Sequence, residues 1–196
     1  KLKKTGTKEG CAEGGCGACT VVLGEFKNNK INYKAINSCI TLLPTLQGKQ
    51  LILVEDLISK DGQLHPVQEA MVNYHGSQCG FCTPGFVMAL FSMFKQNSKL
   101  NNDIIKDSIA GNLCRCTGYQ PIIKAAKSLK NKNKIDHFSK NLKNTIKLLK
   151  KINNKSIAIY KAEKRYFAPR YVQELKKILK KNINANFLSG GTDLSL

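Results

Sequence analysis

The chain has 196 residues, and its 32 Lys and Arg against 13 Asp and Glu give a formal net charge of +19. This length can hold one ordinary domain or two small ones, and no apolar run approaches the roughly 18 residues of a membrane span. Residues 1–10 lack the apolar core of a secretory signal, so the eight cysteines are not expected to form a secreted disulfide framework. We expect a cytoplasmic protein with no membrane partner.

The positive charge is concentrated in one stretch. Residues 122–181 contain 17 Lys and 2 Arg but only three carboxylates, and the lysines alternate with Asn and Ile. Few aromatic side chains accompany them to stack on bases. This pattern is typical of a solvated connector, so nucleic-acid binding is not expected.

Residues 1–60 are expected to be rich in β-structure. Short apolar or alternating runs indicate strands, and the polar run 25–30 indicates a turn. A second turn at Asp61-Gly62 marks the expected end of this part. The predicted strands are residues 20–23, 31–36 and 51–54.

Residues 64–131 are expected to form four helices, because apolar residues recur at helical spacing in four runs. Prolines suit the first turn of a helix, and Thr83 before Pro84 is a candidate N-cap. The first predicted helix begins at Pro66 and ends at Gly76, and the second begins at Thr83-Pro84. Asn102 or Asp103 is the candidate cap of the third helix, in which Ile105, Ile109 and Leu113 have helical spacing. The fourth begins at Pro121.

Residues 132–165 are predicted to be a basic linker that is helical near Phe138 to Leu149. A new unit is expected over residues 166–196. In it, an amphipathic helix follows Pro169, and the apolar run 185–188 predicts a strand that enters a glycine turn at 189–193. Both ends of the chain indicate a segment of a longer protein.

The eight cysteines fall into two sets of four with different spacings. The first cysteine set is Cys11-x4-Cys16-x2-Cys19 with a distant Cys39, which is the plant-type [2Fe–2S] spacing. Glycines surround its first three members, and they allow the backbone to wrap closely and to aim N–H groups at the sulfurs. Zinc sites usually carry two short cysteine pairs, so this set fits zinc poorly.

The second cysteine set is Cys79-x2-Cys82 with Cys114-x-Cys116. Its two pairs lie between the first and second and between the third and fourth predicted helices. A helical bundle would bring these turns together around one cluster. From the residues alone, structural zinc remains an alternative here, because two short pairs suit a tetrahedral ion.

Four stretches resemble the iron–sulfur part of the xanthine dehydrogenase family. Residues 5–21 (TGTKEGCAEGGCGACTV) resemble its ferredoxin-like module. Residues 65–68 (HPVQ), 75–85 (HGSQCGFCTPG) and 111–119 (GNLCRCTGY) resemble its helical [2Fe–2S] domain. The resemblance covers about residues 1–125.

The resemblance implies an α+β fold. A β-grasp, plant-type ferredoxin-like domain, truncated at its N-terminus, is expected over 1–60, followed by a four-helix [2Fe–2S]-binding domain over 64–131. The linker 132–165 then leads to the start of an α+β FAD-binding domain over 166–196. All eight cysteines are implied to ligate iron, as two [2Fe–2S] clusters.

The resemblance also extends to flavin and molybdopterin contacts. Tyr166-Phe-Ala-Pro169 and the run 187–194 resemble the opening of the family's flavin domain, although such a glycine turn on its own is more commonly a plain β-turn. Gln78 matches a position beside the molybdopterin, and an exposed amide at a helix end is an equally common role. The implied FAD contacts are Phe187, Leu188, Ser189, Gly190, Gly191, Thr192, Asp193 and Leu194.

The family implies an electron-transfer role. Electrons from a molybdenum–molybdopterin cofactor, on a partner subunit or a later domain, would pass through the two clusters to FAD and then to NAD+ during purine hydroxylation. The chain order resembles the small subunit of bacterial xanthine dehydrogenase, or the front of the single-chain enzyme. A molybdopterin-binding large subunit, and hence a hetero-oligomer, is the expected partner.

No catalytic residues for the substrate chemistry are expected in this chain. Structural roles are expected for His65, His75 and His137, and Arg115 either offsets cluster charge or faces solvent. Three alternatives remain: a related hydroxylase of aldehydes or other N-heterocycles, a stand-alone ferredoxin-like carrier, and a zinc-bearing nucleic-acid binder.

Overall fold

The computed structural model describes residues 3–96, 100–132, 135–152 and 155–195. Parts of the expected domains at 1–2 and 196, and of the expected linker at 133–134 and 153–154, lie outside the described residues. The strands are β1 (Thr20–Lys27), β2 (Lys30–Asn37), β3 (Lys49–Ile52), β4 (Ile157–Lys161) and β5 (Lys164–Ala168). The α-helices are α1 (Pro66–Asn73), α2 (Thr83–Gln96), α3 (Asn102–Ile109), α4 (Gln120–Ser128), α5 (His137–Lys140), α6 (Leu142–Ile152) and α7 (Val172–Lys181).

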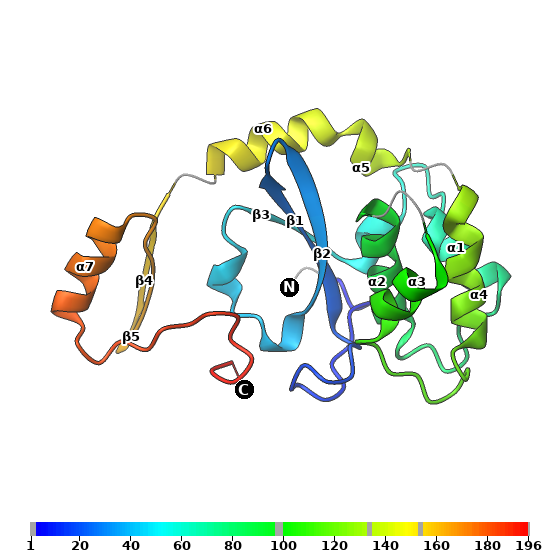
Figure 1. Ribbon diagram of the computed structural model, residues 1–196, viewed down its shortest axis with the longest axis horizontal. Helices are drawn as coiled ribbons and strands as arrows, with labels where there is room; N and C mark the ends of the chain where they lie inside the picture. The colour runs from blue at the N-terminus through cyan, green and yellow to red at the C-terminus, as the bar shows by residue number, and fades with distance from the viewer. Residues whose placement is uncertain (1–2, 97–99, 133–134, 153–154, 196) are drawn as a thin grey trace.

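A three-stranded antiparallel sheet stands at the centre of the molecule, in the order β2-β1-β3. In Figure 1, helices α1 to α4 lie to the right of this sheet, α5 and α6 run across the top, and the β4–β5 hairpin with α7 lies to the left. The first cysteine set is attached to this sheet, and the second lies in the loops between the helices. The mixed α/β composition agrees with the predicted fold class.

The β1–β2 hairpin is longer than predicted. Strand β1 continues to Lys27, so the turn expected over 25–30 is confined to Asn28-Asn29. Both residues have positive φ, 52° and 61°. Two-residue hairpin turns need this left-handed backbone, which asparagine tolerates better than most residues. The polar composition of the run indicated a turn but could not locate its ends.

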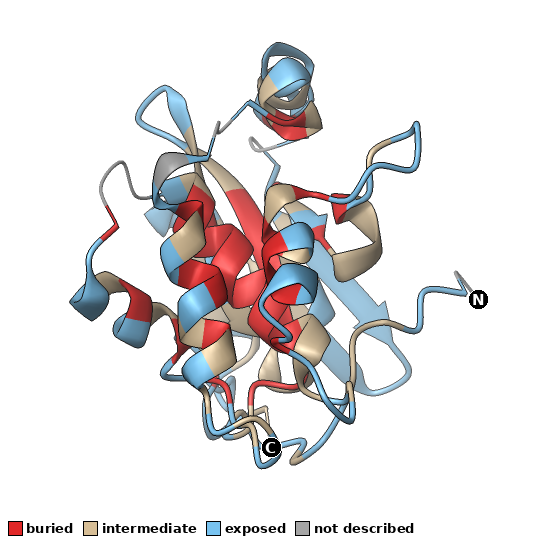
Figure 2. Ribbon diagram, turned by 90° about the vertical axis from the view of Figure 1, so that its right-hand side faces the viewer, coloured by how far each residue is buried: buried red, intermediate tan, exposed pale blue. Residues whose placement is uncertain are grey.

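The helices and the sheet share one hydrophobic core. Helix α2 packs on β1 and β2 and on α1 and α3, and its Phe86, Phe91 and Phe94 are completely buried. Each such side chain stabilises the fold by about 1.5–3 kcal/mol. Val22 and Tyr33 contribute from the sheet to the same cluster. Figure 2 shows the buried segments, in red, gathered in the middle of the molecule with exposed segments, in pale blue, around them. The sheet and the bundle are therefore held firmly against each other.

The four helices lie where they are predicted, but some of their ends differ. Helix α1 ends at Asn73 and not at Gly76. Helix α3 is capped by Asn101, whose side chain accepts the N–H of Ile104, rather than by Asn102 or Asp103. It ends at Ile109, so Leu113 lies in the following loop and is 60% exposed. The helical spacing of Leu113 was coincidental, because Gly111 and the cysteine loop interrupt the helix before it.

The C-terminal part differs more from expectation. Strand β4 falls within the predicted linker and pairs with β5, so a hairpin precedes α7. The predicted strand at 185–188 is wrong: these residues are irregular, and no strand pairs with them in the part of the chain that the structure describes. A strand needs a hydrogen-bonded neighbour, which an apolar run alone does not supply.

A buried polar network joins the connector to the helices. Asp136 accepts hydrogen bonds from His65 Nε2 (3.1 Å) and Lys95 Nζ (2.9 Å). Burial raises the pKa of Asp136, but the bonds from His65, the Ser139 N–H and Lys95 outweigh it and hold this pKa well below its usual range. The structural role predicted for His65 is confirmed, since its Nδ1 also accepts the Val67 N–H at the start of α1.

Across residues 3–96, 100–132, 135–152 and 155–195, none of the helices combines the length and the apolar character needed to cross a membrane.

Candidate metal centres

The first cysteine set is brought together by the β1–β2 hairpin. Cys19 directly precedes β1, and Cys39 follows β2 in a short 3-10 turn, Ser38–Ile40. The strand register pairs Thr20 with Asn37, so the two chains meet at this end and the sulfurs of Cys19 and Cys39 lie 3.2 Å apart. Cys11 and Cys16 lie on the loop before β1, also with their thiols in hydrogen-bond contact.

Backbone N–H groups surround the sulfur of Cys11. Those of Glu13, Gly15 and Cys16 donate to it at 3.5, 3.3 and 3.3 Å. The Glu13 and Cys16 N–H groups are the main reason that the pKa of the Cys11 thiol falls to about 7. This geometry confirms the expectation that the glycine-rich loop aims N–H groups at sulfur, where they stabilise negative charge.

Burial acts in the opposite direction on Cys39. It raises the pKa of this thiol, and the neighbouring Cys19 raises it further. The Cys11 sulfur also contributes to this increase, which shows that the two thiol pairs of the first set lie close to each other.

The second cysteine set is brought together by two loops. Cys79 and Cys82 precede α2, while Cys114 and Cys116 lie between α3 and α4. The thiol of Cys82 contacts that of Cys114, and the thiol of Cys116 contacts that of Cys79. Burial raises the pKa of Cys82 to about 12. The two predicted cysteine turns are therefore neighbours in space.

Thr117 is a neighbour of this set that the sequence did not single out. Its hydroxyl lies 3.1 Å from the Cys114 sulfur, and its N–H donates to the same sulfur at 3.5 Å. Burial raises the pKa of Cys114, but these two bonds and one from the Cys116 N–H bring it below the usual value. The Tyr119 hydroxyl also accepts the Cys114 N–H at 2.9 Å.

Both sets consist of two thiol pairs. The pairs are Cys11 with Cys16, Cys19 with Cys39, Cys82 with Cys114, and Cys79 with Cys116. All eight thiols are free of disulfides. Within the described residues, no three His, Cys, Asp or Glu side chains surround a point that would hold a single metal ion. Two pairs of thiolates are the donor set of a [2Fe–2S] cluster, with one pair for each iron, so both sets fit that group.

The two sets adjoin through a backbone hydrogen bond. The N–H of Leu113 donates to the carbonyl of Cys16 at 2.9 Å. Cys16 belongs to the first set, and Leu113 directly precedes Cys114 of the second. Sequence spacing could not predict this contact, because it joins loops that are almost 100 residues apart.

Most of the remaining predicted residues are exposed, although Gly191 is buried and Leu188 is half-buried. Gln78 and Arg115 are exposed next to cysteines of the second set. The run 187–194 forms an open turn in which Phe187 is 67% exposed. Gly190 and Gly191 have φ values of 76° and 84°, which only glycine adopts without strain. The predicted FAD contacts thus include the expected glycine turn, whereas side chains in mutual contact are found in the cysteine sets.

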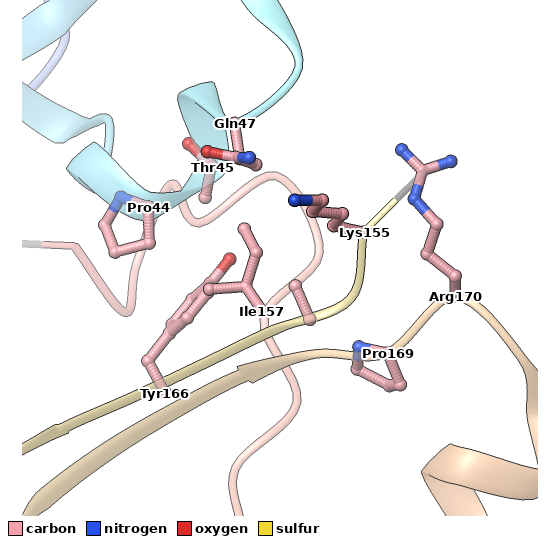
Figure 3. Close-up of a pocket in the computed structure, with 9 residues that line it drawn as sticks. Pro44, Thr45, Gln47, Lys155, Ile157, Tyr166, Pro169 and Arg170 are labelled. Carbon is pink, nitrogen blue, oxygen red and sulfur yellow. The ribbon is translucent and has the colours of Figure 1, made fainter. Parts of the chain in front are cut away.

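A shallow pocket lies elsewhere, between the 43–46 turn and the β4–β5 hairpin. Its volume is about 440 Å³. Figure 3 shows Tyr166 and Ile157 facing Thr45 across it, with Lys155 and Arg170 at its other side. It includes none of the cysteines, and the sequence did not indicate it.

Comparison with known proteins identifies the helical part. Residues 53–127 match the family model described as a [2Fe-2S] binding domain. Aldehyde oxidase 1 of Oryctolagus cuniculus is 46% identical over 130 residues, which is 65% of this chain and 10% of that protein. Xanthine dehydrogenase of Oryza sativa subsp. japonica is 44% identical over 142 residues, or 71% of this chain and 10% of that protein. The chain thus spans about a tenth of the length of these curated relatives.

Two solved structures are also similar. Quinoline 2-oxidoreductase from Pseudomonas putida 86 superposes with a TM-score of 0.55 and 33% identity, over 70% of this chain and 76% of that one. Aldehyde oxidoreductase from Desulfovibrio gigas superposes with a TM-score of 0.56 and 34% identity, over 64% of this chain and 13% of that one. With its paired thiols and these similarities, the chain belongs to the molybdenum hydroxylase family, together with the xanthine dehydrogenases and aldehyde oxidases.

Proposed function

We propose that the chain is the electron-transfer part of a xanthine dehydrogenase-type enzyme. It stands between a molybdopterin-bearing large subunit or later domain and a flavin, with NAD+ as the final acceptor during purine hydroxylation. The assembly is a cytoplasmic hetero-oligomer. The observation that carries this proposal is the presence of two sets of paired thiols in adjoining loops.

Each cysteine set holds one [2Fe–2S] cluster, which accepts and releases one electron at a time. The first set belongs to a ferredoxin-like β-grasp domain over 1–60, and the second to a four-helix domain over 64–131. The residues around the sulfurs set how strongly each site favours added negative charge. N–H groups at Cys11 and the Thr117 hydroxyl at Cys114 favour it, while burial at Cys82 opposes it.

The basic connector 132–165 leads to a flavin-binding unit that begins at 166. The turn at Gly190-Gly191 supports this part of the proposal, because backbone N–H groups of such turns bind phosphate oxygens. The FAD contacts are proposed to be residues 187–194. Gln78, exposed beside Cys79, is proposed to face the molybdopterin of the partner.

Anaerobically purified protein tests the proposal. We expect iron and acid-labile sulfide in equal amounts and two distinct [2Fe–2S] EPR signals after reduction. Cys114→Ser removes only the signal of the second set, and Cys11→Ser removes only that of the first, because each thiol belongs to one site. Zinc in place of iron, or one signal in the wild-type protein, would contradict the proposal.

A related hydroxylase of aldehydes or other N-heterocycles is the second candidate. The similarity to aldehyde oxidase 1, at 46% identity, is as high as that to xanthine dehydrogenase. Turnover of xanthine against an aldehyde and quinoline by the whole enzyme separates the two candidates. The stand-alone carrier is excluded if the chain copurifies with a molybdenum protein.

A further inference from the structure

Asn112 is a buried polar residue that belongs to neither cysteine set. Its side chain is part of a residue only 5% exposed, and its Nδ2 donates to the Gly17 carbonyl at 2.9 Å and to the Thr20 hydroxyl at 3.0 Å. Gly17 lies between Cys16 and Cys19, and Thr20 follows Cys19. The Nδ2 group of Asn112, two positions before Cys114, therefore donates both of these hydrogen bonds to the loop of the first set.

Glycines allow the backbones to approach closely around this amide. A Cβ atom on Gly17 would lie 2.2 Å from the Gly111 carbonyl and 2.6 Å from Asn112 Nδ2. A Cβ atom on Gly85, three residues after Cys82, would lie 2.3 Å from the Gly17 carbonyl. Backbone atoms cannot move aside cheaply, so both positions need glycine. Asn112 thus lies where three segments carrying cysteines of both sets meet.

We propose that Asn112 is a positioning residue that fixes the distance and orientation between the two cysteine sets, and so the rate at which one electron crosses from one to the other. The inference rests on the proposed function. The two hydrogen bonds of the Asn112 side chain hold the loop of the first set against the segment that begins with Asn112. The next residue, Leu113, then keeps its own hydrogen bond to Cys16.

Asn112→Asp is the most direct test. The side chain keeps its size, but a carboxylate oxygen replaces the Nδ2 donor. The hydrogen bond to the Gly17 carbonyl is lost and two oxygens repel each other there. The Thr20 hydroxyl can donate to the carboxylate only by giving up its own bond to the Gly17 carbonyl, so the attachment of the loop is weakened in either case. In reduced protein we expect full iron content, and a weakened or lost spin–spin splitting between the two EPR signals. The splitting depends steeply on distance, and a residue needed only for folding would not change it in a loaded protein.

Asn101→Ala is the matched control. Asn101 is also an asparagine of the helical part, but it caps α3 and contacts neither set. Its replacement destabilises a helix and is expected to leave the splitting unchanged. If both variants alter the splitting equally, general loosening is the cause and the inference is wrong.

Thr20→Val keeps the test decisive if Asn112→Asp does not load iron. It removes the hydroxyl that accepts from Asn112 and preserves the shape of the side chain. A smaller change in the same splitting supports the inference. Wild-type splitting in whichever of these variants loads iron overturns it and leaves the proposed function intact, whereas iron-free wild-type protein would overturn both.

Discussion

At the level of single residues, each cysteine set contains sulfurs in different environments. Cys11 receives backbone N–H groups at 3.3 to 3.5 Å, whereas burial dominates at Cys39 and Cys82. An N–H donor stabilises the thiolate and lowers the thiol pKa, and desolvation does the reverse. Because the same interactions act on negative charge at a cluster, they are expected to separate the properties of the sites.

The Cys11 thiol should therefore ionise near neutral pH in the iron-free protein. Its pKa is lowered to about 7, so the thiolate fraction, and with it the rate of alkylation, rises through that pH. Mass spectrometry after pulses of iodoacetamide at pH 5 to 10 measures the rate for each cysteine. Cys39, whose pKa is raised, serves as the internal control and reacts more slowly at pH 7. A Cys11 midpoint at the free-thiol value of about 8.5 would contradict this prediction.

The cysteines could be predicted from the sequence because ligand spacing is a local property. Asn112 and Thr117 could not, although both lie in the stretch that resembles the family. Their roles depend on a contact to Gly17 and on the path of the loop after Cys114, which follow only from tertiary packing. For Asn112, the only feature of the sequence that could have indicated its role is its position two residues before the predicted ligand Cys114.

At the level of elements, local chemistry explains most of the agreement. The apolar face of α2 and the prolines near the starts of α1 and α4 are sequence features, and the helices lie where they predict. Errors occur where an element depends on a partner. The run 185–188 is apolar but has no strand beside it in the described chain, whereas the run IAIYK of β4, which was placed in the linker, forms a strand because β5 pairs with it.

The glycine turn after 185–188 gives a prediction for flavin binding. Gly191 has a φ of 84°, and an added Cβ would meet Ser195 Oγ at 2.8 Å. In the complete enzyme, Gly191→Ala should distort the turn at a cost of about 1–2 kcal/mol. That cost would weaken FAD binding by roughly 5- to 30-fold.

Gly62→Ala is the control for Gly191→Ala. Gly62 also has a positive φ, 80°, but nothing lies within 4 Å of an added Cβ, and its turn is far along the chain from residues 187–194. Fluorescence of released flavin measures FAD per chain during dilution of the enzyme. If both variants retain flavin equally, the turn at Gly190-Gly191 does not bind FAD and the prediction is wrong.

At the level of the whole molecule, one core and one buried network hold three regions in place. The core joins the sheet to the helices, and Asp136 joins the connector to the start of α1 through His65 and to the end of α2 through Lys95. The connector has 11 Lys and Arg against two carboxylates, so a fixed attachment near its start keeps a highly charged segment in a defined path. The arrangement of the two cysteine sets is built on this frame.

Removing Asp136 should destabilise the frame more than any surface charge would. In Asp136→Ala, the Lys95 ammonium stays buried without its carboxylate, which costs about 3–5 kcal/mol of unfolding free energy. Asp136→Asn keeps a hydrogen-bonding group, so its unfolding free energy should fall by less than that of Asp136→Ala. Asp61→Ala, which removes an exposed carboxylate, should change stability by less than about 0.5 kcal/mol. Urea unfolding of the iron-free proteins measures all three.

The pH dependence identifies the charge as the cause. The pKa of Asp136 is depressed in the folded state, so its contribution is fully present above the unfolded value of about 3.9 and is lost as the pH falls towards the folded pKa. The difference in unfolding free energy between the wild-type protein and Asp136→Asn should therefore be constant from pH 7 to 5 and should shrink below pH 4. An advantage that stays constant down to pH 2.5 would mean that packing, and not the carboxylate charge, attaches the connector to the helices.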